Sequence, residues 1–245
     1  MNKPLNKAID KAKSETTQNK KTKPHYTGHR QRLRERFIIG GAESLQDYEL
    51  LELLLFMAIP RRDVKPLAKD VLATFGSLSA IMNAPHGTLS QIEGISENTA
   101  TAIKTVNAIA HRMMKQELME KPILNNWTRL MDYCHMSMDH ETKEHFRILF
   151  LNKKNMLIAD EIQASGTVDH TPAYPREIMK RALELGATAM ILMHNHPSGD
   201  PSPSKADIDM TKTIIEAART FNITIHDHII MARGKHFSFR QEGLL

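Results

Sequence analysis

Two histidines and an aspartate, His194, His196 and Asp207, have the types and the spacing of a metal site. A short apolar run at 187–193 follows Gly186 and predicts a buried strand. Side chains at positions i and i+2 share one face of a strand. Because the two histidines stand at or just past the end of this strand, their imidazoles are expected to point at one place.

The segment after the second histidine predicts a loop and then a helix. Residues 198–203 contain one glycine and two prolines, which are typical of a loop. Ser204 then has the properties of a helix N-cap, with Asp207 at the third helical position. Two imidazoles and one carboxylate form a ligand set for Zn²⁺ that leaves a fourth position for water, as in catalytic zinc sites. An alternative is that Asp207 serves only in a capping box at this helix end.

The same residues carry a resemblance to known families. His194-x-His196-Pro197, six residues and Ser204-x-x-Asp207 resemble the signature of JAMM (MPN+/JAB) metalloproteases. The longer string HNHPSGDPSPS, together with Tyr-Pro-Arg-Glu-Ile upstream and Asp-His-Ile-Ile downstream, resembles the RadC family of bacterial proteins. The resemblance runs from about Gly28 to the C-terminus. It implies a cytidine-deaminase-like (JAB/MPN) α/β domain with one zinc, which hydrolyses a peptide or isopeptide bond of an unknown substrate by metal-activated water.

The resemblance also implies roles for two further residues. In JAMM enzymes a glutamate on the strand that precedes the zinc motif acts as general base, and the matching residue here is Glu144. Glu141 and Glu161 stay open as alternatives, because spacing along the chain does not give a distance to the metal. In the family the serine that matches Ser204 helps to stabilise the oxyanion formed when water attacks a carbonyl, which is commonly a large catalytic effect.

A second His-x-His sequence, His226 and His228, is a rival metal site. It lies inside an apolar strand and has no acidic residue after it at a matching distance. We therefore predict that these histidines support the first site from behind or fill the core.

Composition excludes several classes of protein. The chain has 245 residues, of which 41% are hydrophobic and 25% are charged, as in ordinary soluble proteins. A membrane span needs an apolar run of about 18 residues, and the sequence has none. The single cysteine, Cys134, excludes an internal disulfide and a zinc site made of cysteines. These features predict a cytoplasmic protein with no membrane partner.

The net charge of +5 is concentrated at the N-terminus. Residues 1–24 contain seven lysines and two acidic residues, while the rest of the chain balances 26 basic with 26 acidic residues. A segment so poor in aromatic residues and so rich in lysine is predicted to be a disordered basic tail. Such a tail attracts nucleic acid without sequence preference.

Residues 25–117 predict an all-α domain. Four arginines fall within residues 30–36, on faces of a first helix that could bind phosphate or simply face water. The segment 89–103 resembles a helix-hairpin-helix module, in which a turn at Gly94 would expose backbone N–H groups to a DNA phosphate. Ser96 replaces the second glycine of that module, and Glu93 adds an acid beside the turn. DNA binding and a purely structural or protein-docking role are therefore both left open.

The remainder, residues 124–245, predicts a second domain that begins after Pro122. Strands interleaved with helices indicate a layered α/β fold. The expected elements are helices at 127–138, 176–185 and 205–221 and strands at 145–151, 156–159, 187–193, 223–230 and 236–239.

Two classes of function follow. The first is a zinc hydrolase of the JAMM type. The alternative is a DNA-binding accessory protein of repair or recombination with a structural or vestigial zinc site. A nucleobase deaminase would need more cysteine ligands, and a two-metal nuclease would need more carboxylates than one His-His-Asp set supplies.

Overall fold

The protein is described by a computed structural model, which covers residues 28–165 and 174–245. The predicted disordered tail, residues 1–24, lies outside the described residues. The chain divides into two compact units, Met1–Lys69 and Asp70–Leu245. Among the described residues, no helix is both long enough and apolar enough to cross a bilayer.

The first unit is built on two helices, α1 (His29–Gly40) and α2 (Asp47–Ala58). Arg30, on α1, donates hydrogen bonds to the carbonyl oxygens of Ile59 (2.5 Å) and Arg62 (2.6 Å), just past the end of α2. Arg30 also donates to the carbonyl oxygen of Phe56 (3.3 Å), in the last turn of α2, where carbonyl groups lack partners within the helix.

A second arginine of α1 is also engaged. Arg36 forms two hydrogen bonds with the carboxylate of Glu49, at 2.8 and 3.0 Å. This guanidinium holds the pKa of Glu49 below its usual range, although burial opposes that effect. Two of the four arginines for which phosphate binding and simple exposure to water were both open, Arg30 and Arg36, therefore hold α1 against α2.

The second unit begins with helices. It contains the end of α3 (Lys65–Phe75) and then α4 (Leu78–Asn83), α5 (His86–Ser90) and α6 (Glu97–Glu120). The turn between α5 and α6 holds Gly94 at φ +92°, a conformation that favours glycine. Ser96 caps α6 by accepting a hydrogen bond from the backbone N–H of Thr99. The predicted all-α character of the N-terminal region is confirmed, and DNA contact by this turn stays a prediction.

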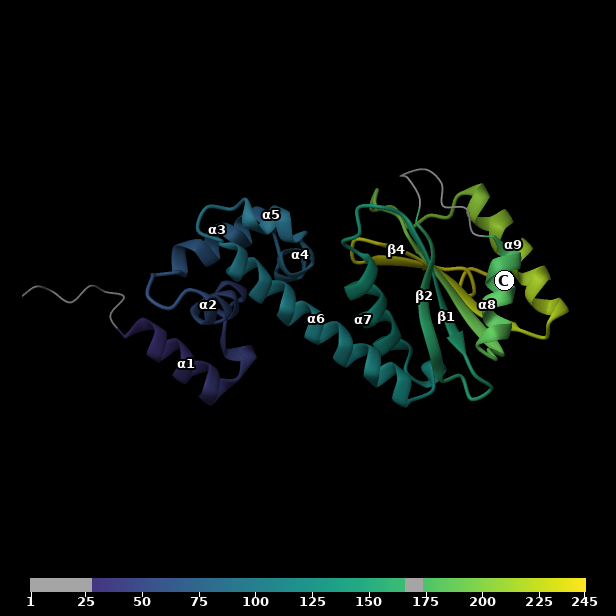
Figure 1. Cartoon of the computed structure of the whole chain (residues 1–245), viewed down its shortest axis with the longest axis horizontal. Helices are drawn as coiled ribbons and strands as arrows, with labels where there is room; N and C mark the ends of the chain where they lie inside the picture. Colours follow the sequence, from purple (N-terminus) through teal and green to yellow (C-terminus); the bar gives the residue numbers. More distant parts are fainter. Residues whose placement is uncertain (1–27, 166–173) are drawn as a thin grey trace, which may run out of the picture. The chain divides into compact units, whose positions relative to one another are not determined.

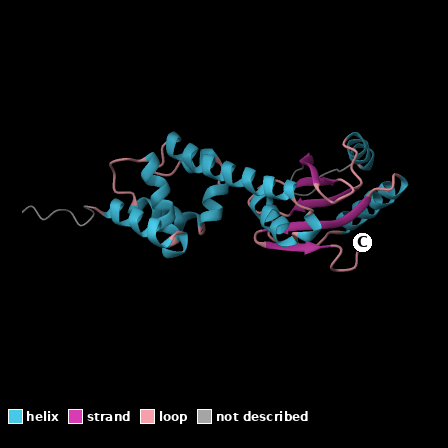
Figure 2. Ribbon diagram, turned by 90° about the horizontal axis from the view of Figure 1, so that it is seen from below, coloured by secondary structure: helices cyan, strands magenta, loops and turns pink. Residues whose placement is uncertain are grey.

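The rest of the second unit is an α/β domain, as predicted (Figure 2). Its described strands form one five-stranded sheet in the order β2-β1-β3-β4-β5, in which β3 and β4 are parallel and the other neighbours are antiparallel. The strands are β1 (His145–Leu151), β2 (Leu157–Ser165), β3 (Ala189–Asn195), β4 (Thr224–Ala232) and β5 (Lys235–Ser238).

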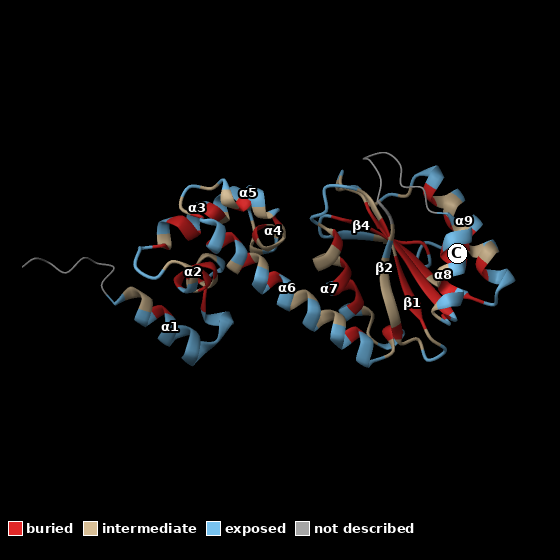
Figure 3. Cartoon of the chain, in the orientation of Figure 1, coloured by how far each residue is buried: buried red, intermediate tan, exposed pale blue. Residues whose placement is uncertain are grey.

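Helices cover both faces of this sheet (Figure 1). On one face lies α7 (Trp127–Met138), packed on alternate residues of β1, β3 and β4. The other face is covered by α8 (Pro175–Glu184) and α9 (Lys205–Thr220), whose outer surfaces are exposed (Figure 3). All seven residues of β3 are buried, so the apolar run that predicted this strand reflects burial on both faces.

The observed strands differ in length from those predicted. β3 begins two residues later than expected and continues through Asn195, so that His194 lies within the strand and His196 directly follows it. β2 is longer than the predicted 156–159, because it pairs with β1 over the whole length of β1. A strand ends where its pairing with neighbouring strands ends. The hydrophobic pattern of a sequence does not show where that pairing stops.

Replacing Arg30 is expected to loosen the first unit. In Arg30→Ala, the carbonyls of Ile59 and Arg62 lose their donor, at a cost of about 1–3 kcal/mol in local stability. Hydrogen exchange of the amides in α1 and α2 measures this loss. Arg61→Ala is the control, because Arg61 is exposed and its change should cost less than about 0.5 kcal/mol. Equal protection in both variants would contradict the structural role of Arg30.

Candidate metal centre

The three residues predicted as metal ligands come together in the structure. The ligand atoms of His194, His196 and Asp207 all lie within 4.8 Å of one another. His194 is the sixth residue of β3, His196 directly follows this strand, and Asp207 is in the first turn of α9. Three loop prolines and Gly199, with φ +90°, turn the chain from the strand to the helix.

The spacing of the three ligand atoms fits a small metal ion. The Nε2 atoms of His194 and His196 are 3.0 Å apart. The carboxylate of Asp207 lies 3.4 Å from the first of these atoms and 3.6 Å from the second. Tetrahedral ligands that stand about 2.0 Å from a zinc ion are separated from one another by about 3.3 Å. The His-His-Asp set therefore has donor types and spacings that could hold a small metal ion such as zinc.

Hydrogen bonds behind His194 fix which of its two ring nitrogens carries the proton. Thr211 Oγ1 lies 2.5 Å from the carbonyl oxygen of Asp207, which can only accept, so the hydroxyl proton is directed there. His228 Nδ1, 2.6 Å from the same Oγ1, must then donate to it. Burial lowers the pKa of His228 well below its usual value, so this ring is neutral and its Nε2 is an acceptor. His194 Nδ1, 2.8 Å from that Nε2, is therefore the donor.

His196 is oriented in a similar way. Its Nδ1 lies 2.8 Å from the carbonyl oxygen of Asp200 and donates to it. In their neutral forms both histidines thus carry their proton on Nδ1 and turn the Nε2 lone pair toward the site. Two lone pairs that face each other across 3.0 Å repel, so either a metal ion or a proton shared with the other ring or with Asp207 has to lie there. The polar groups behind the histidines leave the Nε2 atoms of both rings available to a metal ion.

Asp207 is held by the helix end on which it lies. Its Oδ2 accepts hydrogen bonds from the backbone N–H of Ser204 (2.7 Å) and from the Ser204 hydroxyl (2.6 Å). Burial opposes ionisation of Asp207, but the hydrogen bonds of His194, His196 and Ser204 keep its pKa below the usual range. The predicted capping box is present, and it coexists with the metal-ligand geometry.

The Ser204 hydroxyl is engaged with Asp207 in this arrangement. It donates to Oδ2 and accepts from the backbone N–H of Asp207 at 3.2 Å. These contacts support a role in holding the ligand, and a contact with an oxyanion stays a prediction.

Glu144 stands next to the metal-ligand group. Antiparallel pairing of Phe146 with His194 places Glu144, two residues earlier, opposite His196, just beyond the paired segment. The pKa of His196 is raised mainly by its hydrogen bond to Asp207, and the negative charge of Glu144 adds to this effect. The pairing of β1 with β3 therefore places the backbone of Glu144 opposite that of His196.

Asn195, between the two histidines, holds the backbone on both sides of Glu144. Its side-chain Oδ1 accepts a hydrogen bond from the N–H of His145 at 2.9 Å. Its Nδ2 donates to the carbonyl oxygen of Lys143, also at 2.9 Å. Asn195 is only 1% exposed, so these two hydrogen bonds are shielded from water. The sequence pattern does not single out this residue, because the apolar run that predicts the strand ends at Met193, before Asn195.

The two alternative bases have partners of their own. Glu161 is bound by Arg181 through three contacts of 2.7–3.2 Å, and this partner lowers its pKa. Glu141 is exposed and pairs with His145 Nε2 at 3.5 Å. Glu144 is the carboxylate that strand pairing places opposite a metal-ligand histidine.

The rival pair of histidines is separated by an irregularity in β4. The register between β3 and β4 shifts so that Met190 pairs with Ile225, but Ile191 pairs with Asp227. His226, left out of register, is bonded through Nε2 to Asn155 Oδ1 at 2.8 Å. His228 remains on the face of His194. The two residues therefore do not form a second metal site. His228 supports the first site from behind, which is one of the two roles predicted for these histidines.

Two family models match the chain. The model described as "RadC-like JAB domain" matches residues 124–244. The model described as "UPF0758 N-terminal" matches residues 26–101. The chain belongs to the RadC family. This RadC-family chain thus combines an N-terminal helical region with a C-terminal JAB domain, and the His-His-Asp group of that domain could hold a metal ion.

Removal of the Thr211 hydroxyl is expected to weaken metal binding without touching a ligand. In Thr211→Val the buried His228 Nδ1–H loses its acceptor, and the proton positions of His228 and His194 are no longer fixed. Loss of such a supporting group typically costs 10–100-fold in metal affinity, and we expect a weakening on the order of tenfold.

Competition with a zinc-binding dye measures this affinity. Thr213→Val is the matched control, because the Thr213 hydroxyl is exposed on the same helix and bonds only to the carbonyl of Asp209 in the described structure. His194→Ala should lose the site altogether. Equal zinc affinity in Thr211→Val and Thr213→Val would show that the hydrogen-bond chain does not prepare His194.

Proposed function

We propose that the C-terminal domain is a zinc-dependent hydrolase that cleaves a peptide or isopeptide bond of a protein substrate. The observation that carries this proposal is the convergence of the Nε2 atoms of His194 and His196 with the Asp207 carboxylate, at a strand end where the pairing of β1 with β3 puts Glu144 opposite His196. Membership of a family with a JAB domain supports it. A cytoplasmic location stays a prediction of the sequence.

The metal would be held by His194, His196 and Asp207. When bound, Zn²⁺ lowers the pKa of a coordinated water to about 7 and polarises a carbonyl group. The chain supplies the remaining chemistry. The charge of Asp207, maintained by Ser204 and the two histidines, offsets part of the charge of the cation.

Glu144 is the residue proposed to move the proton. Its carboxylate accepts the proton of the attacking water and delivers it to the leaving nitrogen, which cannot depart as an anion. Asn195 keeps Glu144 in place, because hydrogen bonds to the flanking residues His145 and Lys143 fix the backbone from which the carboxylate extends. A general base has to lie within hydrogen-bond reach of its proton, so a fixed backbone favours proton transfer.

Glu144→Gln is expected to retain zinc and lose hydrolysis. The amide is isosteric with the carboxylate but cannot accept the proton, so kcat should fall at least 100-fold. Activity is measured on a mixture of random peptides and lysine-linked isopeptides, with zinc content determined on the same samples. Glu216→Gln, at an exposed glutamate of α9, is the matched control and should keep activity. Full activity in a folded, zinc-loaded Glu144→Gln protein would rule out the assigned base.

Asn195 is expected to act through Glu144. Asn195→Ala should lower kcat about tenfold while zinc affinity is maintained, and the amide of His145 should exchange faster with solvent because it has lost its acceptor. In a Glu144→Gln background the same change should have little further effect on kcat. An equal loss in both backgrounds would assign Asn195 a role that is independent of Glu144.

A further inference from the structure

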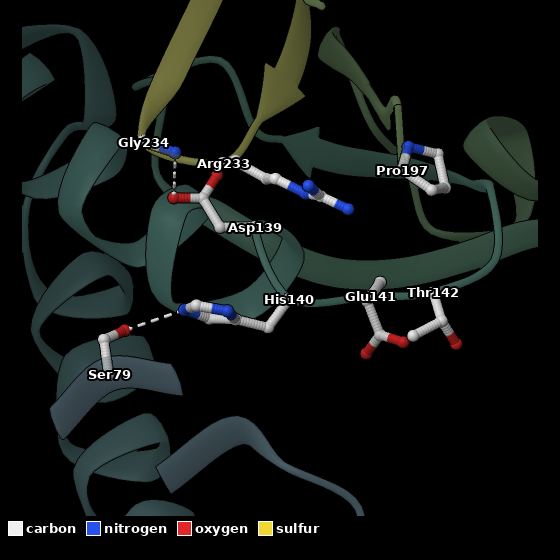
Figure 4. Close-up of a pocket in the computed structure, with 8 residues that line it drawn as sticks. All are labelled: Ser79, Asp139, His140, Glu141, Thr142, Pro197, Arg233 and Gly234. Atoms are coloured by element: carbon white, nitrogen blue, oxygen red, sulfur yellow. Dashed lines mark hydrogen bonds between the residues drawn. The ribbon is translucent and has the colours of Figure 1, made fainter. Parts of the chain in front are cut away.

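A groove of about 630 Å³ is lined in part by Pro197, the residue after the proposed ligand His196, and Figure 4 shows the residues around it. One wall is the loop 139–142, which leads into Glu144, and another includes Pro197, which directly follows the ligand His196. A third wall is the turn formed by Arg233 and Gly234. The groove therefore borders segments that carry both a proposed metal ligand and the proposed base.

Arg233 has an unfavourable backbone conformation at this groove. Ala232 pairs with Lys235 across β4 and β5, which leaves Arg233 and Gly234 as a two-residue turn. Both have positive φ values, +42° and +81°, as in a type I′ turn, where asparagine and glycine are favoured. An arginine in this conformation costs free energy, and residues strained in this way cluster at functional sites.

The side chain of Arg233 lies against the loop that follows the metal ligands. A Cβ atom added to Gly199 would stand 3.3 Å from Cδ of Arg233. A larger residue is disfavoured at position 199 for two reasons: the backbone has φ +90°, and a Cβ atom would crowd the Arg233 side chain. The aliphatic part of Arg233 therefore packs on a glycine surface, and its guanidinium extends into the space between Pro197 and Glu141 (Figure 4).

The charge of this guanidinium is not neutralised by the described part of the chain, in which Arg233 has no hydrogen-bond or ion-pair partner. The acidic residues of the groove have other partners. Asp139 accepts hydrogen bonds from the N–H of Gly234 (2.8 Å) and from His135 (2.9 Å), and Glu141 pairs with His145 (3.5 Å). A guanidinium left without a partner in a groove is suited to a carboxylate, which it binds through two parallel hydrogen bonds.

We infer that this groove binds the substrate chain and that Arg233 pairs with a carboxylate of that chain. The substrate is accordingly a peptide with an acidic side chain or a free C-terminus near the bond to be cleaved. This inference rests on the proposed hydrolase function, and its binding experiment does not require turnover.

The experiment uses the full chain, loaded with zinc and carrying Glu144→Gln so that no peptide is consumed. The probes are the blocked pentapeptide Ala-Ala-Glu-Ala-Ala, its Gln counterpart, and pentaalanine with either a free or an amidated C-terminus. Binding is followed through the backbone amide signals of Gly199 and Gly234. We expect one acidic probe to bind at least fivefold more tightly than its neutral counterpart, and the pair that shows the difference identifies the source of the carboxylate.

Substitutions at position 233 separate recognition from folding. Arg233→Asn should abolish the preference for the acidic probe while Tm stays equal or rises, because Asn-Gly is a favoured type I′ pair. Arg219→Gln, an exposed arginine at the end of α9, is the control and should keep the preference. Acidic probes that bind equally well to Arg233→Asn, through the metal or elsewhere, would overturn the inference, as would the absence of any acidic preference in the Glu144→Gln protein.

A digest of random peptides distinguishes this inference from the proposed function. With Arg233 intact, cleaved bonds should lie near acidic residues or C-termini, and Arg233→Asn should lose this bias. If the wild-type chain cleaves no peptide while the acidic preference in binding depends on Arg233, the hydrolase proposal fails and the carboxylate site stands.

Discussion

The hydrogen bond between His194 Nδ1 and His228 Nε2 is the interaction on which the metal centre depends. It is buried, it decides which nitrogen of His194 carries a lone pair toward the metal position, and it passes through Thr211 to the backbone of Asp207. One chain of hydrogen bonds thus links two of the three proposed ligands. Aromatic rings enclose it, with Phe146 stacked on His194 and Phe239 on His228. Exclusion of water strengthens such a chain and raises the cost of breaking any member.

The central position of β3 explains how so many groups reach one point. The antiparallel partner β1 carries Glu144 just before its first residue, and the parallel partner β4 carries His228. The loop after β3 returns the chain to α9, whose first turn holds Asp207. In α/β sheets, ligand sites commonly lie beyond the carboxyl ends of parallel strands. Here the metal-ligand group lies at the carboxyl end of β3, beside its parallel pairing with β4.

Asn195 and Arg233 show two different ways in which the chain arranges the surroundings of this group. Asn195 is buried and fully bonded, so it fixes the backbone at Glu144 and leaves the position of that residue well defined. Arg233 is exposed, strained and without a described partner, so its charge remains available to a ligand. The arginines of α1 offer a contrast, because Arg30 and Arg36 use their guanidinium groups within the fold. A basic residue type alone therefore does not indicate a binding surface.

The sequence by itself determined the three proposed ligands, because the i, i+2 rule for strands and the position of a helix cap are local properties. It also determined the helix at 127–138 and the strand at 145–151, whose hydrophobic patterns are long and regular. Only the tertiary structure shows that strand pairing puts Glu144 opposite His196, that Arg181 binds Glu161 and that Glu141 pairs with His145, and the assignment of the general base stays a prediction. It likewise decided the separate roles of His226 and His228, because a shift in strand register leaves only His228 in contact with His194. The roles of Asn195, Thr211 and Arg233 arise from contacts between residues distant in the chain, and spacing along a sequence carries no measure of such distances.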